Sequence, residues 1–166
     1  MGELHIRYRN EGTTMPLIIP DSVLINTPPE TLFAHIRENS KNCQRWLKQE
    51  PAHSGIALLC GSGPSIRRDL DDIRAKQAQG AHVFALNAAA KYLNDNGIHP
   101  DFQVMIDAKE ESVDLIGPAK HHLFGATVDP KCFEVKPDAS LFQLQVDDDD
   151  LQADIEEPVT LVPGQR

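Results

Sequence analysis

Short apolar runs alternate with helical stretches from Gly55 onward. The runs are about five or six residues long and nearly continuous, as in strands that are buried on both faces. The strands predicted on this basis are Ile56–Cys60, His82–Leu86, Phe102–Ile106, Leu123–Thr127, Leu141–Val146 and Val159–Val162. The pattern predicts a mostly parallel sheet with helices on both faces, so the fold class is α/β and Rossmann-like.

The stretches between these runs are predicted to be helices and turns that connect one parallel strand to the next. Gly80 and Gly97 stand where glycine ends helices. The predicted connections are helices at Ser65–Gln79 and Ala88–Asn96, and shorter turns near Glu111–Ile116 and Pro130–Phe133.

The N-terminal part follows a different pattern. Residues 1–26 are partly apolar, but two prolines interrupt them, so they form at most an edge strand or a packed arm. Thr27 can cap a helix, and an apolar stripe that includes Trp46 predicts one long amphipathic helix over Pro28–Gln49. We therefore divide the chain into an N-terminal arm and helix (1–54) and a Rossmann-like nucleotide-binding domain (55–166).

Composition narrows the functional classes. The chain has 166 residues and a net charge of −9, which argues against a nucleic-acid partner. Because this charge also repels an anionic nucleotide, binding one would require a local feature such as a helix N-terminus or a metal ion. No apolar run approaches the roughly 18 residues of a membrane helix, and no signal peptide is recognised, so we expect no membrane partner. The 3 cysteines form no CxxC pair, which is typical of reduced thiols in a cytoplasmic protein.

A glycine-rich loop follows the first of these strands. Gly61 and Gly63 would allow tight backbone angles and close approach of a ligand. Ser65 with the N–H groups of Ile66 and Arg67 would face an anion at a helix N-terminus. No lysine follows as in a P-loop, and the dinucleotide fingerprint fails because Ile66 replaces its third glycine. A plain strand–turn–helix connection remains the alternative. The candidate cofactor-binding residues here are Gly61, Ser62, Gly63, Pro64 and Ser65.

Two further polar residues follow the next two strands. Asn87 and Asp107 would share the carboxyl edge of the sheet with the loop, where parallel sheets bind ligands. Asp107 is the candidate catalytic and metal-binding residue, as a partner of ribose or Mg²⁺, with capping of the next helix as the alternative. Asp101 precedes its strand and lies roughly 20 Å away on the opposite edge.

Other clusters of ionisable residues are weaker candidates for a functional site. Asp147–Asp150 could reach the carboxyl edge, but adjacent carboxylates normally lie in solvent. His121 and His122 stand at the start of a strand, on the wrong edge, and the seven histidines show no zinc-ligand spacing.

These motifs together resemble the 6-hydroxymethylpterin diphosphokinase MptE-like family, which also includes the motility accessory factor (Maf) proteins. The family pattern is an apolar strand with G-x-GPS-L, a later small-residue helix opening with Asn or Ser, then G-I-x-PD, a strand and an Asp. The matching residues are Gly61–Ile66, Asn87–Ala89, Gly97–Asp101 and Asp107, and "TVDPKCFE" resembles a later turn of the family. The resemblance extends from Ile56 to Val162.

The resemblance implies a Rossmann-like fold close to that of bacterial sialyltransferases, whose GNGPS loop binds a cytidine nucleotide. Ser62 replaces the asparagine of that loop. The archaeal pterin members resemble Mg²⁺- and ATP-dependent diphosphokinases, and the motility members are associated with glycosyl transfer. The implied nucleotide-site residues are Gly61, Gly63, Ser65, Asn87 and Asp107. Family members usually continue past a strand like Val159–Val162, so we expect the domain to be incomplete at its carboxyl end.

Three functional interpretations stay open. The first is a nucleotide-dependent transferase, either a diphosphokinase that uses ATP or a glycosyltransferase that uses a nucleotide sugar such as a CMP derivative. The second is a module that binds a nucleotide or a protein partner without turnover. The third is a sheet that pairs with a second copy through an unfinished edge, giving a homo-oligomer.

Overall fold

The computed structural model describes residues 5–7, 14–16, 27–43, 45–47 and 54–142. Three features predicted from the sequence lie outside these residues: the strand Val159–Val162, the end of the strand Leu141–Val146, and the acidic run Asp147–Asp150. A short antiparallel pair, β1 (His5–Arg7) with β2 (Thr14–Pro16), precedes the main sheet.

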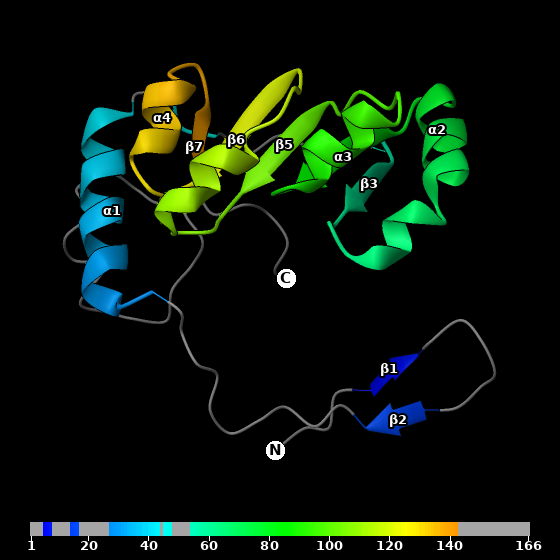
Figure 1. Ribbon diagram of the computed structural model, residues 1–166, viewed down its shortest axis with the longest axis horizontal. Coiled ribbons are helices and arrows are strands. Elements are labelled where there is room, and N and C mark those ends of the chain that lie inside the picture. The colour runs from blue at the N-terminus through cyan, green and yellow to red at the C-terminus, as the bar shows by residue number, and fades with distance from the viewer. Residues whose placement is uncertain (1–4, 8–13, 17–26, 44, 48–53, 143–166) are drawn as a thin grey trace.

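A 5-stranded, all-parallel sheet forms the centre of the molecule (Figure 1). Its spatial order repeats its order along the chain, and the predicted α/β fold class is confirmed. The strands are β3 (Ala57–Cys60), β4 (His82–Leu86), β5 (Phe102–Met105), β6 (His121–Gly125) and β7 (Ser140–Phe142).

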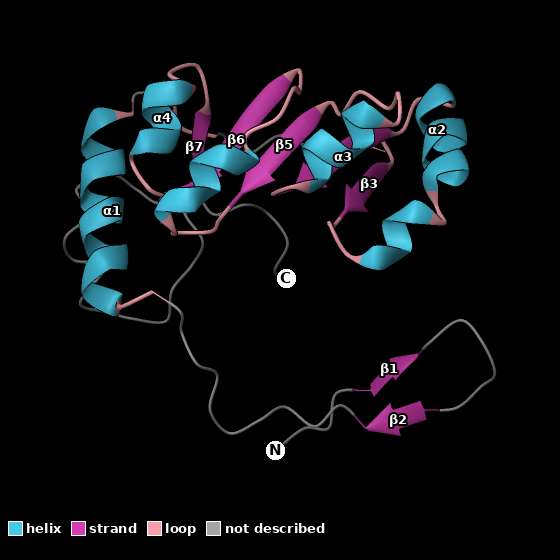
Figure 2. Cartoon of the chain, in the orientation of Figure 1, coloured by secondary structure: helices cyan, strands magenta, loops and turns pink. Residues whose placement is uncertain are grey.

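The connections between these strands lie on one face of the sheet (Figure 2). Parallel crossovers are right-handed, so strands added always in the same direction receive every connection on the same side. The connecting elements are the 3₁₀ turn η1 (Pro64–Arg67), α2 (Leu70–Ala78), α3 (Ala89–Asp95), the 3₁₀ helix η2 (Glu110–Leu115) and α4 (Lys131–Val135). The expectation of helices on both faces is wrong for the described part of the chain.

The two faces of the sheet differ in burial. On the helix-covered face, Val83 and Ala85 pack against Ile73 and Leu93 and are fully buried. On the other face, Leu59 is 73% exposed, Ile106 48% and Leu86 36%. The exposed apolar side chains lie on and just after β3, β4 and β5, so this half of the sheet lacks a covering layer among the described residues.

The N-terminal helix is shorter than predicted. Helix α1 spans Pro29–Asn42, and Cys43 already has extended backbone angles. Trp46, predicted to lie on the helix, pairs instead with Leu141 at the outer edge of β7. The N–H of Leu47 donates to the carbonyl of Leu141, whose own N–H donates to Arg45. Hydrogen bonds with this sheet edge hold the segment in an extended conformation, despite its helical apolar spacing.

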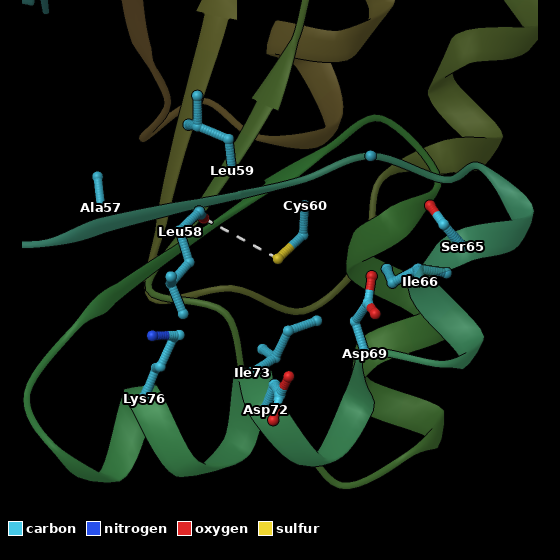
Figure 3. A pocket seen from close by; sticks show the side chains of 11 residues that line it. Ala57, Leu58, Leu59, Cys60, Ser65, Ile66, Asp69, Asp72, Ile73 and Lys76 are labelled. Carbon is cyan, nitrogen blue, oxygen red and sulfur yellow. Dashed lines mark hydrogen bonds between the residues drawn. The ribbon is translucent and has the colours of Figure 1, made fainter. Parts of the chain in front are cut away.

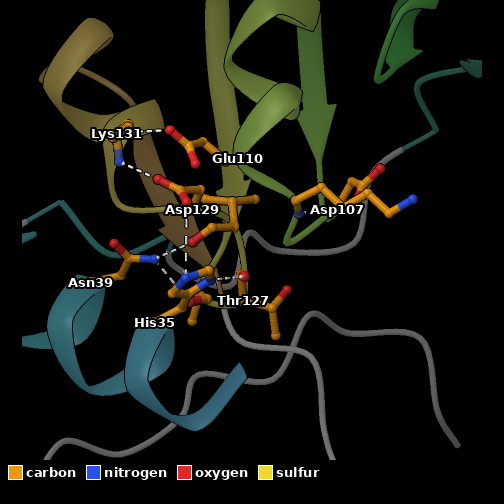
Figure 4. Close-up of polar contacts among 10 residues, drawn as sticks. His35, Asn39, Asp107, Glu110, Thr127, Asp129 and Lys131 are labelled. Carbon is orange, nitrogen blue, oxygen red and sulfur yellow. Dashed lines mark hydrogen bonds and ion pairs between the residues drawn. The ribbon is translucent and has the colours of Figure 1, made fainter. Parts of the chain in front are cut away.

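Helix α1 is held to the sheet by three consecutive carbonyl groups (Figure 4). The Asn39 side chain, in a residue only 2% exposed, donates to the carbonyls of Ala126 at 2.9 Å and Val128 at 2.8 Å. The ring of His35, one turn earlier, donates from Nδ1 to the carbonyl of Thr127 at 3.1 Å. Because turns after strands rarely pair with other strands, these carbonyls need such partners when they are covered.

Asp101 lies at the opposite, amino-terminal edge of the sheet, as the sequence predicts. One oxygen accepts the N–H of Val83 at 2.9 Å, and the other accepts Lys120 Nζ at 2.6 Å. Burial alone would raise the pKa of this carboxyl group, but the hydrogen bonds from Lys120 and Val83 outweigh burial and lower it. The residue therefore joins β4, β5 and β6 at their starts.

Replacing Asn39 with alanine is expected to destabilise the fold by about 2–3 kcal/mol, because two buried carbonyls lose their donors. Urea unfolding measures the change. Asn42→Ala is the matched control, since Asn42 is exposed on the same helix, and it is expected to cost under about 0.5 kcal/mol. Equal losses for the two variants would contradict the anchoring role of Asn39.

Asp101→Asn is expected to cost about 2 kcal/mol at neutral pH, where the charge-assisted hydrogen bonds are intact. The folded-state pKa lies below the ordinary 3.8, so the stabilisation is full above that pH and is lost as the pH falls through the folded pKa. The difference between wild type and variant should therefore shrink below about pH 4. Urea titrations from pH 7 to 3 test this, with the exposed Asp95→Asn as control; a difference independent of pH would refute it.

Candidate functional site

The glycine loop leaves β3 at the carboxyl edge of the sheet and is exposed along its whole length. Gly63 has φ −65° and ψ 162°, and Gly61 also lacks a positive φ. A Cβ atom at either position would meet no atom within 4 Å. The predicted reason for these glycines, a tight backbone, is therefore wrong. The structure leaves open space above both residues, which is what close approach of a ligand requires.

The segment after the loop differs from the predicted continuous helix over Ser65–Gln79. Pro64–Arg67 form a 3₁₀ turn in which the N–H of Ile66 donates to the carbonyl of Gly63, so this N–H does not face an anion as predicted. The α-helix begins only at Leu70, and Asp71 and Asp72 occupy its first turn. Those carboxylates already complement the helix dipole, so any phosphate would be held by the loop itself.

Asn87 is the most unusual residue of the carboxyl edge. It has φ 48°, the only positive φ outside glycine among the described residues. Its N–H donates to the carbonyl of Val104, and its carbonyl accepts Gln103 Nε2 at 2.9 Å. These bonds hold a conformation that costs about 1 kcal/mol or more. Its side-chain Oδ1 is buried without a hydrogen-bond partner, as are the hydroxyl groups of Ser40 and Ser112 among the described residues.

Asp107 follows β5 by two residues and reaches the same edge. Its Oδ1 accepts the N–H of Lys109 at 3.2 Å and shapes the turn before η2. Helix η2 itself has no side-chain cap, so the alternative of helix capping is not observed. Among the described residues no three histidine, cysteine or acidic side chains gather as a metal site. A cation at Asp107 would therefore need ligands from the substrate, as Mg²⁺ commonly takes from phosphates.

The end of β6 adds groups that the sequence did not single out (Figure 4). The hydroxyl of Thr127 donates to the carbonyl of Ile106, and Asp129 Oδ2 lies 4.0 Å from His35 Nε2. Asp129 also caps α4 through the N–H of Lys131 at 3.0 Å. The "TVDPKCFE" motif marked this turn, but its partner His35 stands 92 residues from Thr127 and carries no local signal.

Cys132 lies under this part of the edge and is fully buried. Burial raises the pKa of its thiol to about 12, with further contributions from the charges of Asp129 and Asp107. The thiol is thus neutral at physiological pH and unsuited to nucleophilic attack.

The structure therefore places the predicted site residues on neighbouring strands, in the order β3, β4, β5. Strand spacing is about 4.8 Å, so the glycine loop and Asp107 stand about 10 Å apart with Asn87 between them. His121 and His122 begin β6 at the opposite edge, as expected.

Parallel strands joined by connections that bring a glycine loop, an amide and a carboxylate to one edge define a Rossmann-like α/β domain. The family model of the 6-hydroxymethylpterin diphosphokinase MptE-like proteins matches residues 30–153. The chain belongs to this transferase-like family, which confirms the resemblance seen in its motifs.

A solved structure supports the fold. The Maf glycosyltransferase from Magnetospirillum magneticum AMB-1 superimposes with a TM-score of 0.56 at 21% sequence identity. The match covers 70% of this chain and 20% of that protein, so the chain corresponds to about a fifth of its length. No curated protein matches the sequence. None of the helices in the described ranges is long and apolar enough to cross a membrane.

Gly63→Ala is expected to leave the free energy of unfolding unchanged within about 0.5 kcal/mol, because the backbone angles suit alanine and the space is empty. Gly97→Ala, at φ 73°, is the contrasting variant and should cost about 1 kcal/mol or more. Thermal and urea unfolding compare the two. A loss at Gly63 as large as that at Gly97 would show that the fold itself requires glycine in the loop.

Proposed function

We propose that the chain binds a nucleotide at the carboxyl edge of β3, β4 and β5 and acts in diphosphoryl transfer from ATP to a hydroxymethyl pterin or a similar small molecule. The family name motivates the reaction class. The observation that carries the nucleotide part is Asn87, a strained residue whose buried Oδ1 has no partner beside an exposed glycine loop.

The chemistry of Asn87 assigns it a part of the nucleotide. An unpartnered carbonyl oxygen needs a hydrogen-bond donor, and an ionised phosphate has none to give. Ribose hydroxyls and base amino groups do donate. We therefore assign Asn87 to the nucleoside, which its oxygen can reach once the side chain turns out of its buried position, and the phosphates to the neighbouring loop, with the Ser65 hydroxyl and loop N–H groups as donors.

A divalent cation would help this acidic protein to bind the phosphates of a nucleotide. The net charge of −9 opposes an approaching triphosphate, and carboxylates fill the first turn of α2. Mg²⁺ held between phosphate oxygens and Asp107 would offset this repulsion, with Arg67 exposed at the end of η1 as a further positive charge. Asp107 would then position the metal or the ribose while the phosphates are transferred.

Glycosyl transfer from a nucleotide-activated sugar is the second candidate. The fold shared with the Maf glycosyltransferase favours it. The same edge would bind the nucleotide in both reactions, so the two candidates differ in the nucleobase and in the need for Mg²⁺. A binding module without turnover remains the third, and the cytoplasm is the compartment proposed for all three.

Calorimetric titration with ATP, CTP and CMP, each with and without Mg²⁺, tests the proposal. We expect ATP to bind with Mg²⁺ dependence; preference for CMP would favour glycosyl transfer instead. Asn87→Gly should weaken binding about tenfold without loss of stability, because glycine accepts φ 48° and the substitution removes the whole side chain with its unpartnered oxygen.

Asp107→Asn should abolish the Mg²⁺-dependent part of the affinity. Asp114→Asn is its matched control, since it removes the same charge from an exposed position of η2. Absence of binding to folded protein at millimolar nucleotide would refute the proposed function. Equal effects of the two aspartate variants would refute the role of Asp107.

A further inference from the structure

His35 of α1 and Asp129 of the turn after β6 face each other at the carboxyl edge of the sheet (Figure 4). Nδ1 of His35 lies 3.1 Å from the carbonyl oxygen of Thr127, and a carbonyl only accepts, so Nδ1 carries the proton. In the neutral ring Nε2 then has a free lone pair. Asp129 Oδ2 lies 4.0 Å from this Nε2, too far for a hydrogen bond, and a carboxylate oxygen is also an acceptor. Two acceptors that face each other in this way require a donor from a third group.

Both side chains are held in place by bonds that leave these two atoms available. The other carboxylate oxygen, Oδ1 of Asp129, accepts the N–H of Lys131 at 3.0 Å. Asn39, one turn further along α1, binds the carbonyls on either side of Thr127 and so fixes the turn against the His35 ring. The side-chain exposures are 13% for His35 and 15% for Asp129. A narrow opening of this kind admits one small group of a substrate and excludes most water.

This pair lies next to the candidate metal-binding residue. The hydroxyl of Thr127 donates to the carbonyl of Ile106 at 3.1 Å, and Ile106 directly precedes Asp107. The two strand ends also approach closely, since a Cβ atom on Gly125 would lie 3.3 Å from Ile106 Cγ2. Neighbouring strands are about 4.8 Å apart, so the turn after β6 is the next position beyond Asp107 along the edge. A molecule bound at this turn is adjacent to a nucleotide bound across β3, β4 and β5.

Other polar groups of the molecule are already satisfied. The amino group of Lys131 pairs with Glu110 (Figure 4). A cavity of about 440 Å³ between β3 and α2 is lined in part by the carboxylates of Asp69 and Asp72 (Figure 3). Both residues are exposed, so water supplies their hydrogen bonds, and no histidine is among the described residues that line this cavity. The two facing acceptors of His35 and Asp129 differ because they are largely shielded from water.

We propose that His35 and Asp129 bind the hydroxyl group of the acceptor molecule, and that His35 takes up the hydroxyl proton during transfer. This inference rests on the proposed function, which supplies the nucleotide that donates the transferred group. An ammonium group would also donate to both atoms, but it has no lone pair with which to attack phosphorus. The ligand class is therefore a small molecule with a hydroxyl group on a slender arm, such as a hydroxymethyl pterin.

In the transfer step the acceptor oxygen forms a bond to the β-phosphorus of ATP, and the bond from that phosphorus to the oxygen bridging it to the α-phosphorus breaks. AMP leaves with the electron pair of the broken bond, and the hydroxyl proton moves to Nε2 of His35. The ring is then positively charged and lies 4.0 Å from the carboxylate of Asp129. The two side chains thus accept hydrogen bonds before transfer and attract each other after it.

Nitrogen NMR of the whole chain tests hydroxyl binding without turnover. At neutral pH we expect His35 to be protonated at Nδ1 alone, its signals being assigned by their loss in His35→Asn. Addition of millimolar 6-hydroxymethylpterin, with or without Mg²⁺ and ADP, should move the Nε2 signal upfield, because that nitrogen then accepts a hydrogen bond. The matched compound 6-methylpterin lacks only the hydroxyl and should leave the signal in place. A ring protonated at both nitrogens in the free protein, no shift with either compound, or equal shifts with both would overturn the proposal.

Asp129→Asn tests the site with a variant that is expected to fold. Its oxygen can still accept the N–H of Lys131, and its amide nitrogen can donate to Nε2 of His35. We expect the thermal midpoint to change by less than about 3 °C and the response to 6-hydroxymethylpterin to be lost. Glu134→Gln is the matched control, since it removes the same charge from an exposed position of α4 and should respond as the wild type does. A full response in Asp129→Asn would overturn the site.

Steady-state kinetics test the proton transfer. With ATP, Mg²⁺ and 6-hydroxymethylpterin, His35→Asn should lower kcat about 100-fold, and calorimetric affinity for ATP should stay within about twofold, because asparagine can still donate to the Thr127 carbonyl. A kcat within about threefold of the wild type, or an equally large loss of ATP affinity, would overturn the role of His35 as the base. If the wild type releases no AMP, the proposed function fails together with the proton transfer, and the nitrogen signal still decides hydroxyl binding.

Discussion

The handedness of parallel crossovers is the constraint on which the rest of this structure depends. Strands that follow one another across the sheet receive every connecting helix on one face. Because each strand follows the previous one across the sheet, β3 and the glycine loop lie at an edge of the described sheet. The opposite face is left without a covering layer over β3, β4 and β5 among the described residues. Burial, exposure and the position of the candidate site all follow from this order.

The strands could be predicted because their signal is local. Continuous apolar runs such as His82–Leu86 need no knowledge of the rest of the fold. Helix ends were predicted less well, because distant partners decide them. Trp46 has helical spacing but pairs with Leu141, and the predicted helix from Ser65 is split after the 3₁₀ turn. Spatial strand order was not predicted at all, since sequence periodicity carries no information about which strands are neighbours.

In the candidate site, too, some features could be predicted from local sequence and others depend on distant contacts. Its residues could be placed on one edge because loops after parallel strands meet there. The left-handed conformation of Asn87 and its unpartnered oxygen depend on Val104 and Gln103, which reach it from the next strand. The approach of His35 to Asp129 depends on how α1 docks. Motif spacing thus indicates where chemistry can occur, and tertiary contacts decide which atoms remain available for it.

The docking of α1 also has a consequence for synthesis on the ribosome. Asn39 bonds to carbonyls 87 and 89 residues further along the chain, and Ile36 is buried against Leu141. The helix therefore leaves the ribosome long before its docking surface exists, and its apolar side must wait in water or on a chaperone while most of the sheet is made. Helix α1, although it is synthesised early, is therefore expected to be among the last elements to dock.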